Sequence, residues 1–239
     1  SWKPQGVEVV VLLDTSGSID RRRLSSVQGD AYTGYKAICK TCGAIGVGCW
    51  SHGRRGFYDA RKTSPEPAAW ALATIGRLYG IEDEATEKNL VGAARTEYRS
   101  EHAKPLLEDF YRWADEQAKT ARPTSPLGEA LTYVRNQRET LLRYLEDGRV
   151  SIDNNRSERN LRLVAVGRKN WLFCGSEAAG RAAAIFYSFV VSCRELKIEP
   201  FVYLRDVLER VSTHPARLVW ELTPRGWHET RALLTSEAV

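Results

Sequence analysis

Residues 24–50 read LSSVQGDAYTGYKAICKTCGAIGVGCW and indicate the fold class more clearly than any other part of the chain. The apolar start of this stretch predicts a short strand that stops at the acidic residue Asp30. Residues 31–39 then have helical spacing, and the apolar residues 44–50 predict another strand. Because strand, acidic residue, helix and strand in this order are typical of α/β proteins, we expect an α/β fold.

The chain changes character between residues 64 and 147, where the apolar residues recur at helical spacing. The clearest helix is expected at residues 126–147, with Ser125 as its N-cap, Pro126 in its first turn and Gly148 after its end. After this block the α/β character is expected to return, with a brief extended piece at 150–152 and apolar pieces at 163–166 and 171–174. An apolar helix is expected at 178–196 and an amphipathic segment at 200–211.

We therefore predict an α/β core that is interrupted by an all-helical insertion. The expected division has four parts: 1–63, the first part of the core; 64–147, the insertion; 148–222, the second part of the core; and 223–239, a tail.

The composition of the 239 residues excludes several classes of protein. With 43% hydrophobic and 27% charged residues, the chain is globular rather than disordered. No apolar run approaches the roughly 18 residues of a membrane span. Five cysteines are a low number, and because the number is odd they cannot all pair, so a disulfide framework is not expected. We therefore expect a reducing cytoplasm. The chain contains no Met, so we expect it to be a piece of a longer protein.

The net charge of +5 conceals an uneven distribution along the chain. Residues 20–62 hold nine Lys or Arg and three Asp or Glu, whereas residues 82–118 hold five and ten. Residues 149–181 are basic again, with seven and three. Two basic blocks around an acidic one fit a polyanionic partner such as DNA, although solvated surface charge gives the same pattern.

Two of the acidic residues in these basic blocks are candidate site residues, Asp30 and Glu158. Asp30 follows a predicted strand, which suits either a metal ligand or a turn and helix N-cap. Glu158 lies three residues after Asn155, which suits a capping box. The cationic residues around Glu158 also fit a metal-dependent phosphoryl-transfer site on DNA, in which carboxylates hold Mg²⁺ and basic side chains hold phosphates. The spacing alone leaves both interpretations open.

Two further groups could hold a cation. Zinc-type ligands occur at Cys39, Cys42, Cys49 and His52, but the loop between the two pairs is short. Asp14, Ser16 and Ser18 have the D-x-S-x-S form of the metal-ion-dependent adhesion site of von Willebrand factor A-like domains. The basic run that follows comes too early for such a domain, so a polar turn is the alternative interpretation.

Several motifs, in order, resemble one family. Residues 29–35 (GDAYTGY) are similar to a TDGYAGY motif and residues 48–57 (GCWSHGRRGF) to GCWAHARRKF. Further similarity lies in residues 125–128 (SPLG), 145–148 (LEDG), 152–173 and 203–208 (YLRDVL). Together, about residues 24–222 resemble the bacterial insertion-sequence transposases of the sixty-six family.

This resemblance implies a DDE transposase catalytic domain with a ribonuclease H-like fold, in which three carboxylates bind two divalent ions, Mg²⁺ or Mn²⁺. Asp30 matches the second acid and Glu158 the third. It also implies double-stranded DNA as the partner, a homo-oligomer, no membrane, and a cytoplasmic, nucleoid-associated protein in bacteria. The expected DNA contacts are Arg54, Arg55, Arg156, Arg159, Arg162, Arg168 and Lys169.

The chain departs from the family at its start. The first acid of the family lies well upstream of the second, whereas Asp14 is 16 positions before Asp30 and too close for that role. We therefore expect the chain to be inactive alone. The alternatives are a non-catalytic DNA-binding remnant and an adhesion module on Asp14, Ser16 and Ser18.

Overall fold

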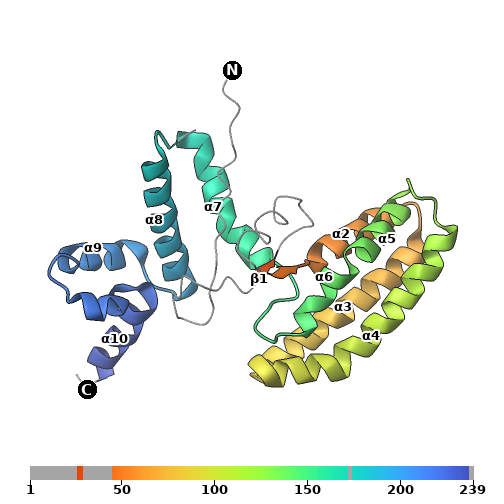
Figure 1. The fold of residues 1–239 in the computed structure, drawn as a ribbon, viewed down its shortest axis with the longest axis horizontal. Coiled ribbons are helices and arrows are strands. Elements are labelled where there is room, and N and C mark those ends of the chain that lie inside the picture. The colour runs from red at the N-terminus through yellow and green to blue at the C-terminus, as the bar shows by residue number, and fades with distance from the viewer. Residues whose placement is uncertain (1–25, 29–44, 172–173, 237–239) are drawn as a thin grey trace. The chain divides into compact units, whose positions relative to one another are not determined.

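The computed structural model of the chain describes residues 26–28, 45–171 and 174–236 (Figure 1). These residues fall into two compact units, one that ends at Arg156 and one that begins at Ser157. The boundary lies in the first turn of a helix, α7.

The first unit contains two strands and a series of helices. Strands β1 (Ser26–Gln28) and β2 (Ile45–Val47) pair in parallel, with Val27 opposite Gly46. The helices that follow are α2 (Trp50–Ala60), α3 (Pro65–Glu87), α4 (Gly92–Thr120), α5 (Pro126–Asn136), α6 (Arg138–Leu142) and the 3-10 helix η1 (Arg143–Leu145).

The expected α/β, ribonuclease H-like fold is wrong. The described residues are mostly helical, and the strands among them are the two three-residue segments of one small sheet. Residues 163–166, which we expected as a separate apolar piece of the returning α/β core, are part of the continuous helix α7. Their neighbours on both sides have helical spacing, and this tertiary and local context outweighs the β-branched character of the short piece. Residues 7–13, an aliphatic and β-branched run that also predicts a buried strand, lie outside the described residues.

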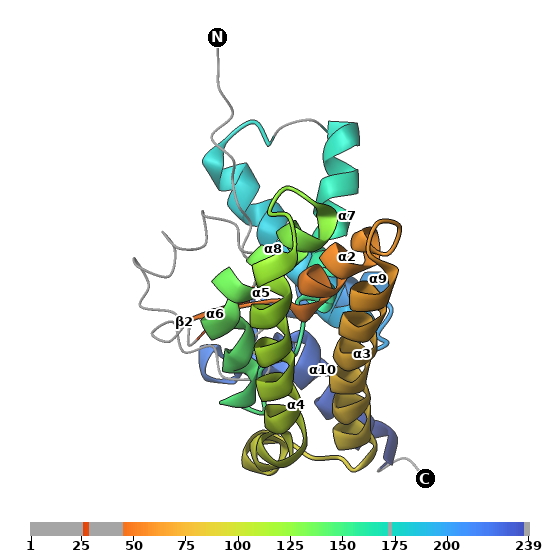
Figure 2. The same ribbon diagram turned by 90° about the vertical axis from the view of Figure 1, so that its right-hand side faces the viewer.

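Four helices of the first unit pack side by side, as both views show (Figures 1 and 2). α2 contacts α3 and α5, and α4 contacts the same two helices, so the four helices enclose one core. α2 buries Trp50, Gly53, Phe57 and Ala60, whose spacing of three and four residues places them on one face. Helices therefore form between residues 64 and 147, as the hydrophobic periodicity predicts.

Aromatic side chains fill the centre of this core. Trp50, Phe57 and Phe110 are fully buried, and the Trp50 and Phe110 rings meet edge to face with their centroids 5.5 Å apart. The Trp50 indole N–H donates to the carbonyl of Leu141 at 3.0 Å, so the one polar atom of this buried ring is satisfied. These contacts attach the start of α2 to the far end of the helical block.

The helix at Pro126 begins as the sequence predicts but ends earlier. The Ser125 hydroxyl accepts a hydrogen bond from the Gly128 N–H at 3.1 Å, which confirms the N-cap, and Pro126 is in the first turn. Gly128 is required there because a Cβ would lie 2.1 Å from the Arg122 carbonyl oxygen. α5 ends at Asn136, and α6 and η1 continue to Leu145 instead of one helix to Asp147.

The second unit consists of helices. They are α7 (Asn155–Trp171), which begins just before the boundary, α8 (Glu177–Glu195), α9 (Pro200–Arg210), the 3-10 helix η2 (Ala216–Leu222) and α10 (Pro224–Ser236). α8 and α9 confirm the two helices expected there. The predicted tail contains α10, which the sequence analysis did not anticipate.

Two residues of α9 join this unit together. Tyr203 is fully buried and donates to the Leu222 carbonyl at 2.6 Å, and its ring meets that of Trp227. The Asp206 carboxylate accepts from the indole N–H of Trp227 at 2.7 Å and pairs with Arg210 and Arg231. α9 is therefore fixed to both η2 and α10. No helix among the described residues is long and apolar enough to cross a membrane.

Candidate functional site

Glu158 lies on the exposed surface of α7, in its first turn. Arg162 is four residues further on and Lys169 eleven, so the three side chains project from the same face of the helix. All three are exposed, and Arg159 is exposed beside them. At about 1.5 Å per residue, this charged face extends for roughly 16 Å along the helix axis. An acidic side chain is thus displayed next to a row of cations.

These cations are available to a ligand. Within the part of the chain that the structure describes, Arg159, Arg162 and Lys169 form no ion pair. Arg156 is also exposed, although it has an interaction within the chain. Arg168 lies in α7. Exposed basic side chains that are not already paired are what binding to a phosphate backbone requires.

The chain is held tightly where it enters α7. The Asp153 carboxylate accepts hydrogen bonds from the Asn155 backbone N–H at 3.1 Å and from its side-chain Nδ2 at 2.8 Å. Its Oδ2 atom also accepts from the Tyr79 hydroxyl of α3 at 2.8 Å. α7 begins at Asn155 itself, so Asn155 is the first helical residue rather than the expected N-cap, and Asp153 takes the backbone hydrogen bond instead.

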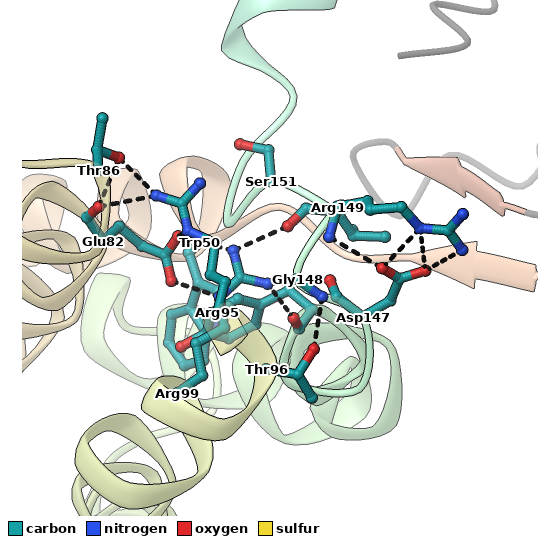
Figure 3. A network of polar contacts seen from close by, with 12 residues as sticks. Trp50, Glu82, Thr86, Arg95, Thr96, Arg99, Asp147, Gly148, Arg149 and Ser151 are labelled. Atoms are coloured by element: carbon teal, nitrogen blue, oxygen red, sulfur yellow. Dashed lines mark hydrogen bonds and ion pairs between the residues drawn. The ribbon is translucent and has the colours of Figure 1, made fainter. Parts of the chain in front are cut away.

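A buried arginine anchors the preceding loop (Figure 3). Arg99 of α4 is 1% exposed and forms two 2.7 Å contacts with the Glu82 carboxylate of α3. Its remaining N–H groups donate to the carbonyls of Tyr144, Asp147 and Val150 at 2.5–3.0 Å. A planar guanidinium can satisfy a carboxylate and several carbonyls at once, so this residue ties two helices to the loop.

The loop also approaches α4 very closely at Gly148. Its N–H donates to the Thr96 hydroxyl at 2.8 Å, and a Cβ at this position would lie 2.1 Å from the Gly92 carbonyl oxygen. Only glycine permits this approach, which explains the glycine in the LEDG motif. The backbone N–H of Trp50 then donates to the Ile152 carbonyl at 3.2 Å, so the loop is fixed on both sides.

A second basic surface lies on α2. Arg54 and Arg55 are exposed, as the expected DNA contacts should be. Tyr58 is on the same side of the helix as Arg54, is 48% exposed, and carries the Arg61 guanidinium 3.4 Å above its ring. Basic side chains interleaved with an exposed aromatic ring are typical of nucleic-acid-binding surfaces. The sequence analysis missed Tyr58 and Arg61, which the spacing of four and seven residues after Arg54 could have revealed.

The other predicted site residues are only partly described. Asp30, Cys39, Cys42, Asp14, Ser16 and Ser18 lie outside the described residues, so the expected approach of Asp30 to Glu158 stays a prediction. Cys49 is fully buried, and burial raises the pKa of its thiol above the ordinary value of 9.0. A raised pKa disfavours the thiolate that zinc needs. Among the described residues, no group of three His, Cys, Asp or Glu could hold a metal ion.

Asp153, Tyr79 and Arg99 are the site residues that sequence reasoning missed. Asp153 lies inside the resembling stretch 152–173 and could have been noticed as another acid near Glu158. Tyr79 and Arg99 are 74 and 51 positions from their loop partners Asp153 and Val150, and no local pattern predicts such contacts.

Comparison with known protein families gives two adjacent matches. Residues 18–182 match the family described as Transposase IS66 family, and residues 188–225 match the IS66 C-terminal element. The first match covers most of the helical bundle and α7, and the second covers the end of α8, α9 and η2.

Three curated proteins of Sinorhizobium fredii (strain NBRC 101917 / NGR234) are similar over most of the chain. The uncharacterized proteins y4hP and y4qI are each 31% identical, over 86% and 83% of this chain. The uncharacterized protein y4jD is 28% identical over 88%. The chain spans 40%, 38% and 43% of their lengths, about two fifths. No solved structure matches significantly. With a family match over residues 18–182, this chain belongs to the Transposase IS66 family.

Proposed function

We propose that this chain forms part of the catalytic region of a transposase that cleaves and joins DNA strands at the ends of an insertion sequence. Membership of the transposase family supports the class of reaction. The observation that carries the proposal is the exposed face of α7, where Glu158 stands beside Arg162 and Lys169. In this proposal the cations hold DNA phosphates and the acid faces the reacting phosphate.

Asp30 and Glu158 are the proposed ligands of two Mg²⁺ ions. Bound divalent ions would lower the pKa of an attacking water or 3′-hydroxyl and neutralise the leaving oxygen. The donor set fits, since carboxylate oxygens are the ligands that Mg²⁺ prefers. The chain itself supplies the anchoring of DNA: Arg159, Arg162 and Lys169 on α7, with Arg54 and Arg55 on α2.

DNA binding is tested first, with fluorescence anisotropy on a labelled duplex over a series of salt concentrations. Arg162→Ala and Lys169→Ala should each weaken binding and reduce the slope of log K against log salt by about 1, because each removes one phosphate contact. Lys104→Ala is the matched control, since it removes an exposed charge of the same sign from the acidic helix α4. Equal effects of all three variants would refute the α7 surface.

Strand cleavage is tested on labelled duplexes that carry insertion-sequence ends. Because the chain spans about two fifths of the length of its curated relatives, the N-terminal part of a family transposase is supplied in trans. Nicking should require Mg²⁺, disappear with Glu158→Gln and persist with Glu177→Gln, an exposed acid in the first turn of α8. DNA binding without nicking would instead favour a non-catalytic DNA-binding role.

A further inference from the structure

We propose that Tyr79 and Asp153 are positioning residues, which fix the first turn of α7 and thereby place the Glu158 carboxylate. The inference rests on the proposed function, because Glu158 is the proposed metal ligand. The observation behind it is the contact between Tyr79 of α3 and Asp153, which lies two residues before the start of α7.

The Asp153 carboxylate is fully engaged within the protein. Oδ1 accepts from the Asn155 N–H, and Oδ2 accepts from both the Asn155 amide and the Tyr79 hydroxyl. Both carboxylate oxygens are therefore fixed between Tyr79 and Asn155. These contacts hold the first helical residue of α7 in place.

Tyr79 is suited to act as a permanent donor in this contact. It is half-buried against the aromatic core, and burial followed by the hydrogen bond to Asp153 raises the pKa of its hydroxyl well above the usual value of 10.0. The hydroxyl therefore keeps its proton at any physiological pH. A hydrogen bond from a neutral donor to a carboxylate is stronger than one between two neutral groups.

The backbone around Asp153 has little freedom to compensate. The carbonyls of Val150 and Ile152 accept from Arg99 and from the Trp50 N–H, and Asn154 is 7% exposed. The movable part is thus the first turn of α7. Glu158 lies only about 4.5 Å further along the helix axis than Asn155. Since metal sites tolerate misplacement of only about 0.5 Å, loosening this turn should disturb Glu158 directly.

The test compares Tyr79→Phe with Tyr98→Phe in this chain. Tyr98 is a matched control because its hydroxyl also donates to a carboxylate across α3 and α4, that of Glu84 at 2.6 Å, on an exposed surface. Two quantities are measured: hydrogen exchange of the amides of residues 157–159, and Mn²⁺ affinity by electron paramagnetic resonance. The thermal midpoints of both variants monitor general loss of stability.

Tyr79→Phe should accelerate exchange at residues 157–159 about tenfold, as expected for loss of a hydrogen bond to a charged group. It should also weaken Mn²⁺ binding by about 10–100-fold, as loss of a group that orients a metal ligand does. Tyr98→Phe should leave both quantities unchanged. Asp153→Ala should reproduce the effect of Tyr79→Phe, and Asp153→Asn, which keeps one acceptor oxygen, should fall between it and the parent.

Unchanged exchange in Tyr79→Phe, or equal acceleration in Tyr98→Phe, would overturn the inference. Mn²⁺ binding that is sensitive to Glu158→Gln but not to Tyr79→Phe would also overturn the inference. That result would leave the proposed function standing. If Glu158→Gln itself leaves Mn²⁺ binding unchanged, the proposed metal ligand is wrong, and with it the inference that Tyr79 places a metal ligand.

Discussion

Arg99 contributes more to the first unit than any exposed ion pair can. Its guanidinium pairs with Glu82 and bonds three backbone carbonyls, and its side chain is almost completely buried. A buried charge of this kind is expensive to desolvate, and its partners depend on it for their hydrogen bonds. Arg99 is therefore required to hold the loop that leads towards α7 against α3 and α4.

Arg99→Ala should lower the free energy of unfolding by about 3 kcal/mol, because the buried Glu82 carboxylate loses two 2.7 Å contacts and keeps only the longer 3.5 Å pair with Arg95. Urea unfolding followed by circular dichroism measures this loss. Arg112→Ala breaks the exposed pair with Asp109 in the same helix and should cost less than about 1 kcal/mol. Similar losses in the two variants would show that the buried network does not have the role assigned to it.

At the scale of single elements, the start of helix α5 was predicted correctly, whereas its end and the extent of α7 were not. Ser125 and Pro126 are local signals for a helix start, and the structure confirms both. In α7 the sequence suggested a helix only at its start, followed by separate apolar pieces on either side of residues 167–169, yet the helix is continuous to Trp171. Short apolar runs do not distinguish a strand from part of a helix, so periodicity alone could not decide this element.

The cap of α5 gives a prediction at this scale. Ser125→Ala removes the acceptor of the Gly128 N–H and should lower the free energy of unfolding by about 1 kcal/mol. Ser100→Ala changes an exposed serine within α4, where alanine is the better helix former, and should cause no loss. Urea unfolding of the two variants measures the difference, and an equal result for both would argue against the cap.

For the whole molecule, local patterns predicted helices but misjudged the fold class. The α/β interpretation depended on residues 24–50, yet each of the two described strands has three residues. The contacts that organise the first unit join residues far apart in sequence, such as Trp50 with Leu141 and Arg99 with Glu82. The motifs identified the family because their residues match those of the family. The packing of the helices depends on contacts between distant residues, which a single sequence does not reveal.

The same distinction applies to the candidate site. Glu158 and the basic residues of α7 were predicted from the sequence, and the structure places Glu158, Arg162 and Lys169 together on an exposed face. Tyr79 and Asp153, which contact each other just before this helix begins, come from different parts of the chain, and their contact became visible only in the structure. The central claim of the proposed function is that Asp30 and Glu158 bind metal at one shared site.

Iron-mediated backbone cleavage tests that claim most directly. Fe²⁺ bound in place of Mg²⁺ generates radicals that cut the chain next to the ion, and mass spectrometry locates the cuts. We predict cuts near both Asp30 and Glu158, suppressed by excess Mg²⁺, absent in Glu158→Gln and retained in Glu177→Gln. Cuts at neither acid, or cuts near Asp30 that persist in Glu158→Gln, would contradict a shared metal site.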